Sequence, residues 1–209
     1  MKNRELAITI AKRMLVDSIW KSAVLEGFNT TFPKTEDILE NLPVNATKDE
    51  ILFIVNMKRA WNFLLDNLDY PVNIGYLEEL NKIVGNNLFY GAGSIRTLPV
   101  SIGGTNWTPG IPVRGVIMGT LHQIDSECLD IRLKALKLFC FVARTQMFLD
   151  GNKRVAQLIA NKVLIDNGVG IFQIPIEAID HFKHLLVTFY ETGIDDKIIA
   201  FMQDYCLQQ

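Results

Sequence analysis

Two long apolar segments joined by a short polar stretch constrain most strongly what this chain can fold into. The first segment reads LDIRLKALKLFCFVARTQM and the second reads VAQLIANKVLIDNG, with FLDGNKR, residues 148–154, between them. Apolar side chains recur in both segments at three- and four-residue steps, which places them on one face of a helix. The pattern predicts two core-facing helices connected by a tight polar turn.

Helical periodicity and helix-start signals also occupy most of the remaining sequence. Residues 4–25 carry apolar side chains at helical spacing. Thr47 and Glu50 form a capping-box pattern that opens a helix, and Asn73 can cap another. These two helices are expected to end near residues 66 and 87. Four further helices are expected: a short one near residues 36–40, one that begins at about Pro112, and two over residues 176–192 and 195–206. The sequence shows no internal repeat and no clear linker, so it predicts one mainly α domain.

One segment differs from the rest in its composition. The sequence FYGAGSIRTLPVSIGGTNWTPGIPV, which begins at residue 89, is rich in glycine and proline with β-branched residues between them. It predicts a β-hairpin with strands at Leu98–Ile102 and near Trp107, joined by a Gly103-Gly104 turn. A lone two-stranded hairpin is only marginally stable, so we expect this one to pack against the helices.

Composition fits a soluble globular protein and argues against two classes of partner. Of the 209 residues, 49% are hydrophobic and 21% are charged, and the formal net charge is −2. This charge gives no general basic surface for nucleic acid. The sequence contains no run of about 18 apolar residues, so no membrane-spanning helix is expected.

The N-terminal residues and the cysteines indicate a reduced, cytoplasmic compartment. Charged side chains interrupt the first twenty residues, so no apolar core of a signal peptide forms. Cys128, Cys140 and Cys206 are widely spaced and match no disulfide or metal-binding pattern. We therefore expect a cytoplasmic protein with free thiols.

The polar turn has the chemistry of an anion site. Gly151 or Asn152 would cap a helix that begins near Lys153, and the first backbone N–H groups of that helix lack internal partners. Lys153 and Arg154 add positive charge at the end where the helix dipole is already positive, which is favourable only if an anion is bound there. Asp150 could supply an oxygen to Mg²⁺. The alternative interpretation is an ordinary turn with a solvated Lys-Arg pair.

The wider sequence resembles the Fic (fido) family motif H-P-F-x-D/E-G-N-G/K-R. Phe148 and residues 150–154 match it, and residues 94–110 resemble the flap, the hairpin that aligns a target protein beside the active site in that family. The resemblance implies a single Fic-like domain over residues 1–209. Residues 1–70 would form N-terminal helices that include an inhibitory helix, and residues 71–209 a Fic core with its motif at 146–157.

The resemblance also implies roles for individual residues. Gly151 and Lys153 would belong to the backbone anion hole for the nucleotide phosphates. Asn152 would contact the α-phosphate, Arg154 the β- and γ-phosphates, and Asp150 would bind Mg²⁺. Most family members transfer AMP from ATP to a protein hydroxyl, so ATP, Mg²⁺ and a target protein docked at the flap are the implied ligands. The sequence leaves open whether copies of the chain form a homo-oligomer.

The motif departs from the family at the position of its catalytic base. Gln146 stands where the family has histidine, and a glutamine cannot accept the proton of the attacking hydroxyl. A general base contributes about 10²–10⁴-fold in rate, so weak or lost catalysis is expected. His122, His181 and His184 lie outside the motif and are expected to be surface or core histidines. Gln157 stands where many members have a second arginine.

A second resemblance lies near the N-terminus. Residues 22–27, SAVLEG, match the inhibitory pattern S/T-x-x-x-E-G/N of Fic proteins. Glu26 would obstruct productive ATP binding, with Ser22 supporting it and Gly27 ending the helix. Because Gln157 replaces the usual arginine partner, Glu26 would have to pair with Arg154 or Lys153.

Two alternatives to an autoinhibited nucleotide-binding Fic protein follow from the same residues. The chain could be a non-enzymatic interaction module whose flap binds an extended peptide by strand addition. It could also catalyse a different transfer reaction in which the substrate or solvent handles the proton.

Overall fold

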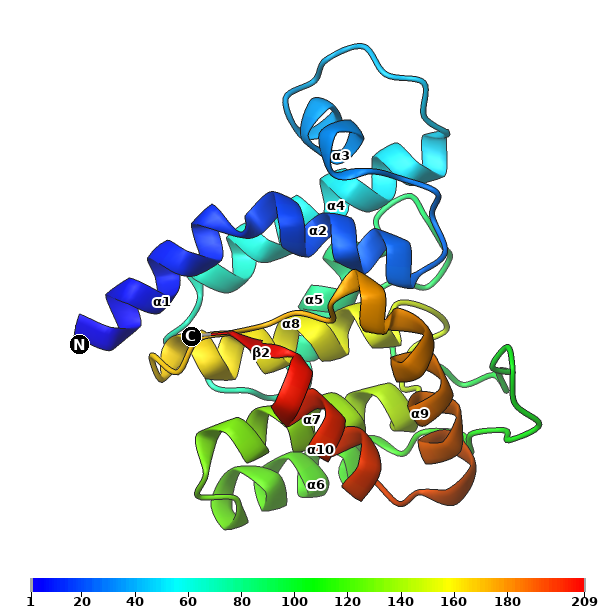
Figure 1. The fold of residues 1–209 in the computed structure, drawn as a ribbon. Coiled ribbons are helices and arrows are strands. Elements are labelled where there is room, and N and C mark those ends of the chain that lie inside the picture. Colours follow the sequence, from blue (N-terminus) through cyan, green and yellow to red (C-terminus); the bar gives the residue numbers. More distant parts are fainter. Residues whose placement is uncertain (1, 209) are drawn as a thin grey trace.

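The computed structural model describes residues 2–208, which form a mainly helical protein (Figure 1). The buried apolar side chains form one contiguous core. No helix among the described residues combines the length and the apolar character needed to cross a membrane. The helices are α1 (Lys2–Arg13), α2 (Leu15–Leu25), α3 (Phe32–Leu39), α4 (Lys48–Asp66), α5 (Ile74–Val84), α6 (Arg114–Glu127), α7 (Ile131–Thr145), α8 (Asn152–Asp166), α9 (Ile179–Thr192) and α10 (Asp196–Tyr205).

Helix α8 is the centre of the fold. Every residue from Arg154 to Ile165 is buried. In Figure 1, α8 lies between an upper layer that contains α1, α2 and α4 and a lower layer that contains α6, α7 and α10. The two helices predicted on either side of the polar turn are α7 and α8, which pack against each other. The turn between them is therefore held by the most buried part of the molecule.

Side-chain caps begin several helices where the sequence predicted them. Thr47 Oγ1 accepts a hydrogen bond from the Glu50 N–H at 3.2 Å, and Asn73 Oδ1 accepts one from the Tyr76 N–H at 3.0 Å. The Glu50 carboxylate forms an ion pair with Lys34 at 2.8 Å. This carboxylate therefore ties the start of α4 to α3.

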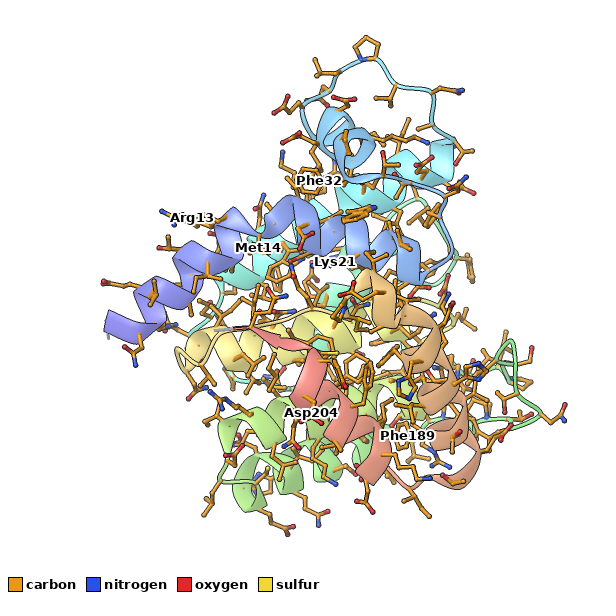
Figure 2. All side chains as sticks on the ribbon, viewed as in Figure 1. Arg13, Met14, Lys21, Phe32, Phe189 and Asp204 are labelled. Carbon is orange, nitrogen blue, oxygen red and sulfur yellow. The ribbon has the colours of Figure 1, made fainter. Side chains whose placement is uncertain are left out.

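The helix predicted over residues 4–25 is divided at Met14, which lies at the junction of α1 and α2 (Figure 2). Met14 has a ψ of 7°, which opens the helix locally. The hydrogen bonds on either side are kept, because the Met14 N–H still bonds to Ile10 and the Met14 carbonyl still accepts from Ser18. The two helices thus form one bent rod.

The mainly α fold class is confirmed, but the predicted strands at Leu98–Ile102 and near Trp107 are wrong. Residues 94–110, which we call the flap segment, form a loop that folds back at the Gly103-Gly104 turn without a strand ladder. Side chains bind backbone groups that a ladder would use: Arg96 donates to carbonyls on both arms, and the Trp107 N–H donates to Thr105 Oγ1.

The sheet found among the described residues lies elsewhere and has two short strands. Strand β1 (Ile171–Phe172) follows α8 and pairs antiparallel with β2 (Leu207–Gln208), which follows α10. Asn161 on α8 bonds both backbone groups of Phe172, accepting from its N–H at 2.8 Å and donating to its carbonyl at 2.9 Å. A buried amide thus fastens this sheet to the central helix.

Candidate functional site

A cavity of about 550 Å³ lies at the N-terminal end of α8, a volume ordinary for a small-molecule site. We call it the motif cavity. Four segments that are distant in the sequence form its walls, and they meet on the right of Figure 1. They are the end of α2 with Leu25–Gly27, the flap turn with Ser101–Gly104, the motif turn with Gln146 and residues 149–153, and α9 with Lys183, Leu186, Val187 and Tyr190.

Gly151 shapes the turn that opens α8. Its φ is +81°, and a Cβ there would lie 2.9 Å from Asn81 Nδ2. The same Asn81 nitrogen donates a 2.8 Å hydrogen bond to the Asp150 carbonyl. Among residues 2–208, no side chain caps the N-terminus of α8. The turn therefore presents the positive end of the helix to the cavity without a built-in partner.

Asn152 is buried and organises the turn from within. Its Oδ1 accepts from the Phe148 N–H at 3.0 Å, and its Nδ2 donates to the Phe148 carbonyl at 2.9 Å and to Gln146 Oε1 at 3.0 Å. Phe148, the expected anchor of the turn, is fully buried. The predicted contact of Asn152 with an α-phosphate stays a prediction, since its side chain is already hydrogen-bonded here.

Gln146 ends α7 in the left-handed conformation, with φ 46° and ψ 52°, which costs a non-glycine residue about 1–2 kcal/mol. Its Nε2 donates to the Ala143 carbonyl at 2.6 Å, so both ends of its amide are bound. Nearby Tyr190 is buried in the cavity wall. Burial first, and the Glu26 carboxylate second, raise the pKa of the Tyr190 phenol, so it stays protonated at neutral pH. Neither side chain can act as a base.

The three histidines do not replace the missing base. His122, His181 and His184 are all exposed. They are absent from the lining of the motif cavity, and His181 packs edge-on against Phe201. Within residues 2–208, no three His, Cys, Asp or Glu side chains gather as a metal site would require.

Glu26 reaches the motif from α2. Its Oε2 lies 3.4 Å from Lys153 Nζ, and both residues line the motif cavity. Its Oε1 and the Ser22 hydroxyl are buried and have no hydrogen-bond partner in the described chain. Gly27 has a φ of +92°, which turns the chain away at the end of α2. The structure thus brings residues 22–27 beside the motif turn, with Lys153 as the partner of Glu26.

Arg154 does not line the motif cavity. Its side chain is buried between the rings of Phe53 and Phe89, with Cζ 5.5 and 5.3 Å from their centroids. Its Nη2 lies 2.9 Å from Asp150 Oδ1, and its Nη1 donates to the Val84 carbonyl at 3.3 Å. The predicted contact of Arg154 with β- and γ-phosphates stays a prediction, because its guanidinium is engaged elsewhere here.

Comparison with known proteins finds likeness in structure and none in sequence profile. No protein-family model matches the chain, and no curated protein matches it significantly. The solved structure of Fic-1 from C. elegans superposes on 94% of the chain with a TM-score of 0.79 at 20% identity. A Fic family protein from Desulfovibrio desulfuricans covers 90% at 0.76 and 13% identity. A Fic domain-containing signalling protein from Bacteroides thetaiotaomicron covers 94% at 0.76 and 18% identity.

The chain has the Fic fold. At these identities the likeness establishes the fold and not the activity. The chain spans 62% of the C. elegans structure, 61% of the D. desulfuricans structure and 82% of the B. thetaiotaomicron structure. The fold expected from the motif resemblance is therefore confirmed, while the roles of individual motif residues are not tested by the comparison.

Arg96 joins the flap segment to the motif of this Fic fold, and no pattern in the sequence predicted this role. The side chain is buried, and no carboxylate among residues 2–208 pairs with it. Its Nε donates to the Gln146 carbonyl at 2.6 Å, its Nη1 to Leu98 at 2.7 Å and its Nη2 to Gly110 at 2.6 Å. Burial lowers the pKa of Arg96, but a guanidinium stays charged in proteins. One side chain thus binds both flap arms and the end of α7.

Sequence reasoning also missed two cavity residues on α9. Lys183 is exposed at the cavity wall, and Tyr190 forms part of it. The residues 176–192 were predicted as a helix, but periodicity alone does not show which turn of a helix faces a distant loop. Lys183 adds a second cation to the lining of the motif cavity, which also includes Lys153.

Replacing Arg96 by lysine should loosen the flap segment. Arg96→Lys keeps the charge but loses the planar fork, so at least one buried carbonyl is left without its donor. We expect the free energy of unfolding to fall by about 2–3 kcal/mol, measured by urea denaturation, with faster amide exchange in residues 94–110. The matched control is Arg114→Lys, because Arg114 is an exposed arginine paired with Glu78. Equal stability changes in the two variants would contradict the assigned role of Arg96.

Proposed function

We propose that this protein binds ATP with Mg²⁺ in the motif cavity, as protein adenylyltransferases of the Fic family do, and that it is autoinhibited with weak or lost AMP transfer. The observation that carries the proposal is the composition of one cavity. The motif turn, the flap turn and the Glu26 segment, separated by dozens of residues in the sequence, all line it. A turn between two helices that served only to connect them would not need the other two segments.

The charges in the motif cavity fit a polyphosphate. Lys153, in the first turn of α8, and Lys183, on α9, both line the cavity, and the N-terminus of α8 has no side-chain cap among the described residues. Backbone N–H groups at a helix start and nearby cations are the usual ligands of phosphate oxygens. We infer that the phosphates lie along the motif turn, with Lys153 as their direct cationic contact.

Asp150 fits the role of the magnesium ligand. Its side chain is 58% exposed and lines the motif cavity, while its Oδ1 accepts from the Gly151 N–H and pairs with Arg154. Mg²⁺ at nucleotide sites is usually bound by one or two carboxylates together with substrate phosphates and water. A bound Mg²⁺ would supply charge neutralisation at the phosphates. Arg154 would meanwhile fix the orientation of the Asp150 carboxylate.

Autoinhibition follows from the pairing of Glu26 with Lys153. A phosphate that binds Lys153 has to displace the Glu26 carboxylate or lie beside it, and like charges in close contact in a half-buried site are costly. Glu26 is 17% exposed in its side chain, so water screens this repulsion poorly. Ser22 lies one helical turn before Glu26, and its carbonyl accepts from the Glu26 N–H at 3.1 Å, which fixes the backbone of Glu26 at the end of α2.

Catalysis is expected to be weak because the motif cavity holds no titratable group where the family has its base. Gln146 cannot accept a proton, and the phenol of Tyr190 stays protonated. Loss of a general base lowers the rate by about 10²–10⁴-fold. Binding of the nucleotide does not depend on that base, so it can persist where transfer does not.

Removing the charge of Glu26 should strengthen ATP binding. We expect Glu26→Gln to bind Mg²⁺-ATP roughly tenfold more tightly than the natural chain in calorimetric titration, because one repulsive carboxylate is lost. Lys153→Ala in the same background should lose most of the binding. The matched control is Glu40→Gln, since Glu40 also ends a helix, α3, but is exposed and does not line the motif cavity. No binding by Glu26→Gln would contradict the nucleotide proposal.

Restoring the histidine should restore transfer. Gln146→His combined with Glu26→Gln should raise incorporation of radiolabelled AMP into protein by about 10²–10⁴-fold, the contribution of a general base. Gln123→His in the same background is the matched control, because Gln123 is exposed on α6 away from the motif cavity. If the natural glutamine already supports equal labelling, the substrate or solvent handles the proton instead.

One observation favours a second candidate function, a non-enzymatic module that binds an extended peptide. In the part of the chain that the structure describes, no strand pairs with residues 98–102. The Leu98 carbonyl already accepts from Arg96, but the backbone groups of residues 99–102 make no hydrogen bond within the described chain and are therefore available for strand addition. This function requires no nucleotide and would explain why Gln146 is tolerated.

Proline in the flap segment separates the two functions. Ser101→Pro removes one backbone donor and should abolish binding of extended peptides selected from a displayed library, while Ser101→Ala should keep it. The binding should not change when Mg²⁺-ATP is added. If neither variant alters peptide selection, strand addition at residues 98–102 is not the function of this segment.

A further inference from the structure

A second cavity, of about 570 Å³, is lined by Trp107, which does not line the motif cavity. We call it the α6–α7 cavity. Its walls come from α6, α7, the end of α9 and residues 107–113. They are mainly apolar and include Ile111, Val113, Val116, Ile117, Phe141 and Phe189. Figure 2 labels Phe189 near the end of α9, beside α10. This cavity has no part in the proposed nucleotide site.

Arg144, near the end of α7, is the unusual member of this lining. Its Cζ lies 4.6 Å from the ring centroid of Trp107 and 5.9 Å from that of Phe189. The described chain shows no ion pair of Arg144. The charged neighbours Lys137 and Asp195 pair with each other at 2.9 Å. The α6–α7 cavity therefore contains one cation that the protein does not neutralise.

The guanidinium of Arg144 is also fixed in direction. Its Nε donates to the carbonyls of Phe189 and Tyr190, at 3.2 Å each, which are among the last carbonyls of α9. Gly193 allows this close approach, because a Cβ there would lie 3.2 Å from Arg144 Cζ. Capping α9 thus uses Nε alone. The two terminal nitrogens make no hydrogen bond within the described chain, and they are not buried.

We propose that the α6–α7 cavity binds a small apolar carboxylic acid. Its carboxylate accepts both terminal N–H groups of Arg144 in the bidentate geometry that a guanidinium fork favours. Its apolar body lies against Val116 and Ile117 on α6. A single negative charge matches the single unpaired cation. A phosphate would bring close to two charges and leave one of them uncompensated against an apolar wall.

The ligand would touch the aromatic wall that the two cavities share. Trp107 stacks on Tyr190 with ring centroids 5.9 Å apart and an angle of 15° between the rings. Tyr190 lines the motif cavity, and Trp107 lines the α6–α7 cavity. A ring or chain bound over Arg144 lies beside Trp107, so its binding should change the fluorescence of this tryptophan.

The test is a titration of the full chain with phenylacetate, followed by ligand-observed NMR and by tryptophan fluorescence. We expect saturable binding with a dissociation constant on the order of 0.1–1 mM, as the size of this ligand allows. The uncharged analogue 2-phenylethanol and inorganic phosphate should each bind at least about tenfold more weakly. The first lacks the carboxylate that Arg144 would bind, and the second lacks an apolar body.

Matched variants place the ligand. Arg144→Gln should weaken phenylacetate binding by about tenfold or more, whereas Arg132→Gln, the same change at an exposed position of the same helix, should not alter it. Val116→Glu sets a carboxylate on the α6 wall at a side chain that is 63% exposed, so the fold should be kept while the acid is repelled. Val116→Glu therefore tests the location of the ligand even if Arg144→Gln fails to fold.

Several results would overturn the proposal. They are the absence of saturable phenylacetate binding, equal binding of 2-phenylethanol or of phosphate, and unchanged phenylacetate binding in folded Arg144→Gln or Val116→Glu protein.

Discussion

The geometry of the motif end of this protein depends on a buried arginine that has no counter-ion in the described part of the chain. Arg96 is 3% exposed and is bound by carbonyl oxygens of the flap segment and of Gln146, while its own N–H donates to the Met147 carbonyl. A buried charge is tolerated only where its donors are satisfied, so the loop must keep both arms in place around the guanidinium. That constraint explains how a segment without a strand ladder is ordered. It also explains how Gln146 is held with a positive φ.

Charge balance organises the site that this geometry creates. Lys153 and Arg154 follow each other at the start of α8, yet their side chains lie in different surroundings. Arg154 is buried with Asp150, and Lys153 stands in the motif cavity with Glu26. Each cation at the positive end of the helix dipole has therefore received a protein carboxylate. The pairs have different exposures: the Arg154 side chain is 6% exposed and that of Lys153 is 30% exposed. A phosphate can thus compete for Lys153 much more readily than for Arg154.

Local signals predicted most of the fold, and distant contacts account for what they missed. The caps at Thr47 and Asn73 and the helices around the polar turn depend on neighbouring residues, so the sequence specified them. The two predicted strands of the flap segment were wrong. The pattern of β-branched residues and glycines does not show that the Arg96 side chain would bind carbonyls on both arms, in place of a strand ladder. The meeting of Glu26 with Lys153 was expected only from the family resemblance, since the two residues are 127 positions apart in the sequence. Lys183 and Tyr190 had no signal at all, because their place depends on how α9 docks.

The stacked rings of Trp107 and Tyr190 give the two cavities a common wall. Protein interiors are close-packed, so a ring that moves on one side needs room on the other. Trp107 belongs to the flap segment and Tyr190 to α9, and Arg144 joins them by lying over the Trp107 ring while bonding to the Tyr190 carbonyl. A ligand that held Trp107 in place would therefore also restrict the arm of the flap segment that follows the Gly103-Gly104 turn. The turn and the residues just before it line the motif cavity. A change at one cavity can thus reach the other through one layer of side chains, formed by Trp107, Tyr190 and Arg144.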